Sequence, residues 1–221
     1  MTLQEIINSI DFFKTLTQEQ VQELCTIATL KNFSKDSILY YESESTNNLM
    51  FLVKGLLKVY KVDKFDNEIF LYHIHEKNMI SELTSLKQRE IFCFSNAEFM
   101  KDSEVLSINF EKFTELFLSK DILTQDFIEE LLKKTQQLQC IINRELVFDA
   151  TAKVAFMLHN DLEMFNNIKR QEVSFLLHIQ PETLSRVLKR LTRNKIIDVI
   201  SGEVIILNAQ ELASIFRGIA V

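Results

Sequence analysis

The most regular pattern of apolar and polar positions lies near the C-terminal end, in residues 180–193. Its apolar residues recur at i, i+3, i+4 and i+7, the spacing of one helix face: Leu184, Val187, Leu188 and Leu191. Its polar residues repeat one step out of phase: Glu182, Ser185, Arg186 and Lys189. Pro181 suits the first turn of a helix, where its missing N–H needs no partner. The pattern predicts a helix that packs one face on a core and exposes the other.

A helix-turn-helix followed by a wing is predicted around this segment. Arg170–Leu177 carries apolar residues at helical spacing, and His178-Ile179-Gln180 is short enough to be the turn between two helices. Ile196–Ile200 and Glu203–Leu207 are short apolar runs joined by Ser201-Gly202, which predicts a β-hairpin.

The N-terminal half combines two helices with many strands. Leu3–Ile10 and Thr17–Thr29 have helical patterns, and Thr17 with Gln20 forms a capping box. Beyond them the period changes to two, in short runs rich in Phe, Tyr, Val and Ile: Ser37–Tyr41, Leu49–Val53, Leu56–Val62, Glu68–Ile74, Ile91–Phe99 and Glu104–Ile108. Many short strands without long helices between them predict a sandwich or barrel.

A long helix is predicted between these halves, from about Asp121 to Phe148. A seam near the heptad period, interrupted by Lys134 and Glu145, is expected to form a dimer interface: Phe127, Leu131, Leu138, Ile141 and Phe148. A second apolar group lies beside it: Ile128, Leu132, Ile142 and Leu146. We expect the helix to pack on its own barrel and on a second copy; the alternative is a monomer whose helix lies wholly against the barrel. Asp149 is expected to cap a helix over Ala150–Leu158.

The helix-turn-helix differs in charge from the rest of the chain. Residues 169–195 hold seven cationic and two anionic side chains, a net +5, whereas the remainder carries −11. Most of the surface therefore repels phosphate while this patch attracts it, which favours a nucleic-acid-binding face. The alternative is a solvated helix whose charges only face water.

Composition, cysteine positions and the absence of motifs narrow the classes of protein to which the chain can belong. With 221 residues and 47% hydrophobic content, two domains are expected. No apolar run approaches the roughly 20 residues that span a bilayer, and the N-terminus lacks the pattern of a secretory leader, so we expect a cytoplasmic protein. Cys25, Cys93 and Cys140 lie far apart, with no ligand spacing for zinc or an iron–sulfur cluster and no disulfide framework. No nucleophile–base pair or phosphate loop indicates an enzyme.

Over nearly its full length the chain resembles the CRP/FNR family of bacterial transcription regulators. The matching segments are Tyr41-Glu42, Leu49–Tyr60 with Gly55, Ile80-Ser81-Glu82-Leu83, Arg170-Gln171-Glu172 and Pro181–Leu191. The resemblance implies an α+β chain with three parts. These are a jelly-roll β-barrel sensor like a cyclic-nucleotide-binding domain (1–120), a dimerisation helix (121–148) and a winged helix-turn-helix that binds DNA (149–221). It also implies a homodimer and RNA polymerase as a partner.

Glu182-x-x-Ser185-Arg186 is similar to the recognition helices of FNR-type members, which implies a TTGA-like half-site in an inverted repeat. Arg186 can donate to guanine O6 and N7, Glu182 can accept from a cytosine amino group, and Ser185 can approach a thymine. Alternatively, Glu182 only favours the positive end of the helix dipole and Arg186 pairs with it. Five other cations are expected to contact phosphates: Lys169, Arg170, Lys189, Arg190 and Arg193.

The sequence defines the effector of the sensor domain less clearly than it defines the DNA-binding residues. Cyclic-nucleotide members hold the ribose with a Glu, and here Glu82 remains, but Phe92-Cys93 stands where the resemblance places an Arg-Ser pair for the phosphate. Leu138 and Gln139 lack the hydroxyls expected on the dimer helix. A buried phosphate without such partners is costly, so we expect that cAMP is not the effector. Arg89 is interpreted as a solvated loop residue.

Other effector modes stay open. The candidate pocket comprises Glu82, Phe92, Cys93 and His73. Some relatives sense gases through haem, and His73 or His75 among aromatic residues offers an axial ligand. A redox switch at Cys93 or Cys140 has no cationic neighbour in sequence to lower the thiol pKa. A barrel without any ligand is a further possibility, and so is a binding module of this fold that no longer reads DNA.

Overall fold

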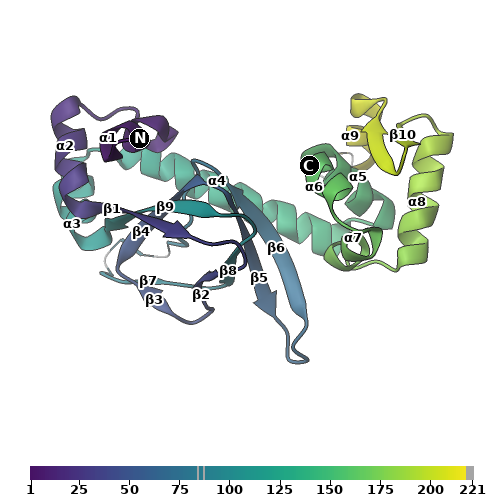
Figure 1. Ribbon diagram of the computed structural model, residues 1–221, viewed down its shortest axis with the longest axis horizontal. Helices are drawn as coiled ribbons and strands as arrows, with labels where there is room; N and C mark the ends of the chain where they lie inside the picture. The colour runs from purple at the N-terminus through teal and green to yellow at the C-terminus, as the bar shows by residue number, and fades with distance from the viewer. Residues whose placement is uncertain (84, 87, 218–221) are drawn as a thin grey trace. The chain divides into compact units, whose positions relative to one another are not determined.

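The computed structural model describes residues 1–83, 85–86 and 88–217 of the chain. It divides into two compact units, Met1–Gln137 and Leu138–Val221 (Figure 1). Within these residues no helix is both long and apolar enough to cross a membrane.

The first unit begins with helices α1 (Leu3–Ser9) and α2 (Gln18–Ile27) and a 3-10 turn, η1 (Asp11–Phe13), between them. The capping box at the start of α2 is confirmed: Thr17 Oγ1 accepts from the Gln20 N–H at 3.3 Å, and Gln20 Oε1 accepts from the Thr17 N–H at 2.8 Å. These two bonds satisfy N–H groups that have no partner inside the helix, so the capping residues fix where α2 begins.

Among the described residues nine strands follow, and they form open sheets instead of a closed barrel. One sheet has the order β1-β9-β4, with strands Ala28–Phe33, Ser103–Asn109 and Asn48–Lys54. A second has the order β2-β8-β5-β6, with strands Ile38–Tyr40, Asn96–Phe99, Leu56–Val62 and Glu68–His75. A two-stranded sheet pairs β3 (Ser45–Thr46) with β7 (Ile91–Phe92). All pairings are antiparallel.

Strand β4 lies between two cores. Its residues Leu49 and Phe51 pack with α1, α2 and α3 (Phe110–Leu116), while Met50 and Leu52 pack among the side chains enclosed by the second sheet. Successive side chains of a strand point to opposite faces, so one strand serves a helix-covered core and a core inside the roll. This explains why β4 reads as a continuous apolar run in the sequence.

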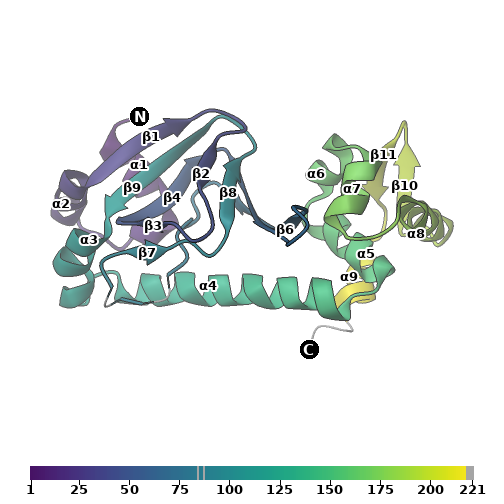
Figure 2. The same ribbon diagram turned by 90° about the horizontal axis from the view of Figure 1, so that it is seen from below.

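Helix α4 (Thr124–Ile142) begins in the first unit and runs past its last residue, Gln137 (Figure 2). It continues as a π-helical turn, η3 (Asn143–Val147). The structure corrects the expected dimer seam on it. Phe127 is 2% exposed in the first core, and Leu131 packs on the same core. Phe148 lies in the core of the second unit. These three side chains are therefore not available to a second copy.

The exposed stripe of α4 consists of residues that the sequence placed mainly in the second apolar group. Ile128 is 45% exposed, Leu132 58%, Leu138 56% and Ile142 53%. Because a helix places 3.6 residues in each turn, Phe127 and Leu131, which pack in the helix-covered core, lie on a different face of α4 from this stripe. Ile141 is half-buried.

The second unit is helical with a small hairpin. Its helices are α5 (Ala150–Asn160), α6 (Leu162–Asn167), α7 (Arg170–Leu176), α8 (Pro181–Arg193) and α9 (Ala209–Arg217), and they share one core. The Asp149 side chain accepts from the Ala152 N–H at 2.8 Å, which confirms the expected cap of α5. Strands β10 (Ile197–Ile200) and β11 (Glu203–Ile206) pair around Ser201-Gly202, both at positive φ, as a tight hairpin turn requires.

Candidate DNA interface and sensor interior

Helix α8 has one buried and one exposed face. Leu184, Val187 and Leu191 are 2%, 5% and 1% exposed in the core of the second unit. The polar residues on the other face are all exposed: Glu182, Ser185, Arg186 and Lys189. Pro181 occupies the first turn of the helix. The three candidate base-reading side chains therefore lie together on one outward surface.

Arg186 is held loosely by its own helix. Its Nη2 donates to the Thr183 hydroxyl at 3.2 Å, one turn earlier. That bond uses one of the five N–H donors of a guanidinium, so the others remain available to a base edge. The exposed side chain of Arg186 can therefore reach away from the protein surface.

The cations around α8 fall into two groups. Lys169, Lys189 and Arg193 are exposed and fit the expected phosphate contacts. Arg190 instead donates from Nη2 to the Thr151 hydroxyl in the first turn of α5. Arg190 therefore belongs to a second group, whose side chains donate hydrogen bonds to other residues of the same unit.

Arg170 belongs clearly to the second group, which corrects its expected role. It donates to the Phe165 carbonyl at 2.8 Å and to the Gly202 carbonyl at 2.7 Å, and its guanidinium lies 4.3 Å from the centre of the Phe165 ring. Partial burial lowers the pKa of Arg170. Arg170 therefore ties the start of α7 to the wing turn, a contact that its sequence position beside Lys169 did not reveal.

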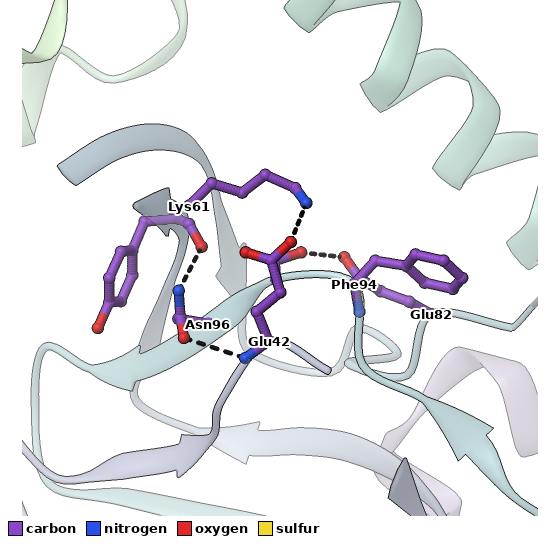
Figure 3. A network of polar contacts seen from close by, with 7 residues as sticks. Glu42, Lys61, Glu82, Phe94 and Asn96 are labelled. Carbon is purple, nitrogen blue, oxygen red and sulfur yellow. Dashed lines mark hydrogen bonds and ion pairs between the residues drawn. The ribbon is translucent and has the colours of Figure 1, made fainter. Parts of the chain in front are cut away.

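Inside the roll, the Glu82 carboxylate accepts hydrogen bonds from three groups of the protein. It accepts from the Tyr72 hydroxyl at 3.1 Å, the Phe94 N–H at 2.9 Å and the Ser95 hydroxyl at 2.7 Å. Figure 3 labels Glu82 beside Phe94. Three donors satisfy most of the hydrogen-bonding capacity of a carboxylate without a ligand. They also fix the backbone at 93–95, which separates β7 from β8.

A second set of bonds in Figure 3 fixes the segment after β2. Asn96 accepts from the Glu42 N–H at 3.0 Å and donates to the Tyr60 carbonyl at 3.4 Å, and Lys61 forms an ion pair with Glu42. These bonds link β2, β5 and β8 at one end of the roll.

The four residues of the expected effector pocket have different surroundings in the structure. Cys93 is 3% exposed in the inner core, where burial, followed by the charges of Glu82 and Glu44, raises the pKa of its thiol to about 11. Phe92 is 37% exposed and stacks edge-on against Phe94, with 4.8 Å between ring centres. His73 lies 4.7 Å from the Phe70 ring and lines a separate cleft beside α4. The lining of that cleft does not include Glu82, Phe92 or Cys93.

Lys134, which interrupts the apolar seam in the sequence, has a defined environment in the structure. Its Nζ donates to the Ile80 carbonyl at 3.5 Å and lies 5.7 Å from the centre of the Tyr72 ring. Burial lowers its pKa to about 8, although Glu82 and Glu130 oppose this shift. The sequence feature that distinguishes Lys134 is a charged side chain at an apolar position of a long helix.

Two family matches cover most of the chain. Residues 30–120 match the cyclic nucleotide-binding domain, and residues 154–215 match the Crp-like helix-turn-helix domain. The cAMP-activated global transcriptional regulator CRP of Salmonella typhimurium is 23% identical over 80% of this chain and 89% of its own length. The same-named regulator of Pasteurella multocida is 20% identical over the same shares.

Solved structures share the fold. A CooA mutant from Carboxydothermus hydrogenoformans has a TM-score of 0.68 at 17% identity, covering 97% of this chain and 95% of that one. FixK2 from Bradyrhizobium japonicum has a TM-score of 0.64 at 18% identity, covering 86% and 97%.

Proposed function

This chain belongs to the CRP/FNR family of DNA-binding transcription regulators, and we propose that it acts as a homodimer whose α8 helices read an inverted DNA repeat. The observation that carries the proposal is the outward face of α8, where Glu182, Ser185 and Arg186 are exposed above a buried apolar face. A helix with this division can enter the major groove while its other face stays in the core.

The proposed half-site is TTGA-like. Arg186 has the donors for guanine O6 and N7, Glu182 accepts from cytosine N4, and Ser185 is short enough to approach a thymine methyl group. Lys169, Lys189 and Arg193 are proposed to contact phosphates, which would place the helix in the groove without selecting sequence.

The exposed stripe on α4 supports a homodimer. Three residues of this stripe, Ile128, Leu132 and Ile142, fall in one seam with the exposed Thr135 and Gln139, and Leu138 lies beside it. The five seam positions follow one another by alternate steps of four and three residues, the spacing of a coiled coil. Two copies joined along a two-fold axis would present two α8 helices to half-sites about one helical turn, roughly 34 Å, apart.

A binding titration with two duplexes tests this proposal. One duplex carries two TTGA half-sites as an inverted repeat, and the control has the same half-sites moved apart by about half a helical turn, so that they lie on opposite faces of the DNA. We expect tight, salt-sensitive binding to the first and much weaker binding to the second. Equal affinity for both would contradict a symmetric dimer that reads base edges.

We also propose that cAMP is not the effector. The Glu82 carboxylate already accepts three protein donors, and the phosphate position implied by the resemblance holds the Phe92 ring and the buried Cys93 thiol, which are not anion ligands. An isothermal titration of the full-length protein with cAMP should show no saturable heat. A saturable signal in that titration would overturn this part of the proposal.

The cleft beside His73 does not favour haem. Its volume is about 70 Å³, whereas ligand pockets usually measure about 300–1,000 Å³. We therefore propose a regulator without haem, with RNA polymerase as the protein partner expected of the family.

A further inference from the structure

Two charged side chains on the outward face of α8 have the spacing of an ion pair but do not form one. Glu182 precedes Arg186 by four residues, which is the favoured order for an acidic and a basic side chain on a helix. Both side chains are exposed. Among the residues that the structure describes, however, neither an ion pair nor a hydrogen bond joins Glu182 to Arg186. The guanidinium therefore takes its direction from another contact.

That contact is the hydroxyl of Thr183, which accepts a hydrogen bond from Arg186 Nη2 at 3.2 Å. Thr183 lies in the first turn of α8, where its own N–H donates to the Gln180 carbonyl at 2.9 Å. Its side chain is half-buried, and a β-branched side chain in a helix is restricted to one or two χ1 rotamers. The Thr183 hydroxyl is therefore an acceptor with a well-defined position beside Arg186.

The bond with Thr183 draws the Arg186 guanidinium toward the N-terminal end of α8. A positive charge is disfavoured there, because the helix dipole makes that end partly positive. In helices that read DNA, however, the N-terminal residues are the ones that reach base edges in the major groove. The position of the guanidinium therefore suits base reading better than it suits the stability of the helix.

The contact leaves the groups needed for base reading available. A guanidinium has five N–H donors, and Thr183 uses one of them, so others remain for guanine O6 and N7. The Glu182 carboxylate keeps its oxygens for the amino group of a cytosine. In an ion pair, by contrast, the donors of Arg186 and the oxygens of Glu182 would satisfy one another. They would then have to separate before either could contact a base.

We propose that Thr183 is a positioning residue of α8, whose hydroxyl keeps the Arg186 guanidinium away from Glu182 so that each charged group reads its own base. This inference rests on the proposed reading of DNA by α8. An exposed ion pair within a helix and an exposed hydrogen bond are both weak interactions. One hydroxyl is therefore enough to decide which partner Arg186 takes.

Substitution of Thr183 by valine tests the proposal, because valine has nearly the same shape and lacks the acceptor. Anisotropy titrations of the full-length protein compare an inverted TTGA repeat with random DNA at one fixed salt concentration. Thr183→Val should bind the repeat at least about threefold more weakly, because one hydrogen bond is lost at each half-site. It should bind random DNA as the wild type does, which also shows that the variant folds. Thr183→Ser keeps the hydroxyl and should bind the repeat with nearly the affinity of the wild type.

Thr192→Val is the matched control. Thr192 is the other threonine of α8 and is also half-buried, but it lies in the last turn of the helix. Its substitution should leave the binding of both duplexes unchanged. An equal loss of Thr183→Val on both duplexes would assign Thr183 to a phosphate contact and overturn the proposal. Wild-type affinity of Thr183→Val for the repeat would overturn it as well.

A modified duplex shows whether Thr183 acts through Arg186. In this duplex, 7-deazaguanine, which lacks the N7 acceptor, replaces the guanine of each half-site. The change should cost the wild type more affinity than it costs Thr183→Val, because the variant already contacts the guanine poorly. Equal losses would show that Thr183 and the guanine contact are independent, which contradicts a positioning role.

Arg186→Ala separates this inference from the proposed function. If Arg186→Ala loses the preference for the repeat while Thr183→Val keeps it, the positioning role is refuted and the proposed DNA reading stands. A wild-type protein that does not prefer the repeat over random DNA would refute both.

Discussion

Gly55 shows how one position in the roll depends on the absence of a side chain. Its φ is +109°, and a Cβ built there would lie 2.0 Å from Ser103 Oγ and 2.7 Å from Ser103 Cβ. Gly202, in the wing turn, also has positive φ, but a Cβ there would meet nothing within 4 Å. A side chain at Gly202 would therefore cause backbone strain alone, whereas one at Gly55 would also overlap with Ser103.

We expect Gly202→Ala to lower the free energy of unfolding by about 1–2 kcal/mol through backbone strain alone. Gly55→Ala should cost about 1–3 kcal/mol more, because the roll must shift to accept the methyl group. Urea unfolding of each variant measures the difference. A smaller loss for Gly55→Ala than for Gly202→Ala would show that the contact with Ser103 does not restrict this position.

Cys93 is expected to be chemically inert at neutral pH. Burial first, and then the Glu82 and Glu44 carboxylates, raise the pKa of its thiol to about 11, so at neutral pH it is almost entirely protonated. Because the thiolate is the nucleophile, Cys93 should react with a maleimide at least about 100-fold more slowly than the exposed Cys140. Mass spectrometry of the alkylated peptides measures both rates, and comparable rates would revive a redox role for Cys93.

Single residues also show where sequence reasoning stops. Glu182, Ser185 and Arg186 could be placed on an exposed face because helical spacing alone decides it. The contacts of Arg170 with Gly202, and of Lys134 with Ile80 and Tyr72, join residues far apart in the chain. No local pattern encodes such contacts, so the sequence alone predicts a phosphate contact for Arg170.

Among the elements, the helix-turn-helix was predicted closely and the roll less so. Helices α7 and α8 and the wing have strong periodicity, a proline start and a turn pair, which fixes their bounds to within a few residues. The sequence missed β1, because this edge strand pairs only with β9 and exposes most of its residues. It merged β7 and β8 into one strand, since the break at 93–95 is made by the distant Glu82.

Substitution of Arg170 tests whether this residue ties α7 to the wing turn. Arg170→Met removes two hydrogen bonds from a charged donor to carbonyls and should lower the free energy of unfolding by about 2–3 kcal/mol. Its neighbour Lys169 is exposed. Lys169→Met should leave stability unchanged but reduce the slope of log affinity for DNA against log salt by about 1.

Urea unfolding and salt-dependent anisotropy titrations, run on both variants, separate the two roles. If Arg170→Met kept wild-type stability and lost one unit of salt slope as Lys169→Met does, Arg170 would be a phosphate ligand after all.

At the scale of the whole molecule, the proposed dimer depends on the exposed stripe of α4. Leu132→Glu places a carboxylate in the proposed seam and should weaken dimerisation about tenfold or more, because the charge would lose water on association. Cys140→Glu adds the same charge on the same helix outside the stripe and is the control. Sedimentation equilibrium distinguishes monomer from dimer. A Leu132→Glu protein that remains as dimeric as the control would exclude this seam.

The central claim is that α8 reads base edges, and the affinity ratio between an inverted TTGA repeat and random DNA tests it most directly. It is measured by anisotropy at one fixed salt concentration for wild type and Arg186→Ala. The variant should lose about 1–3 kcal/mol on the repeat and little on random DNA, so that its ratio falls. An equal loss on both duplexes would show that Arg186 only attracts phosphate and would contradict base reading by this helix.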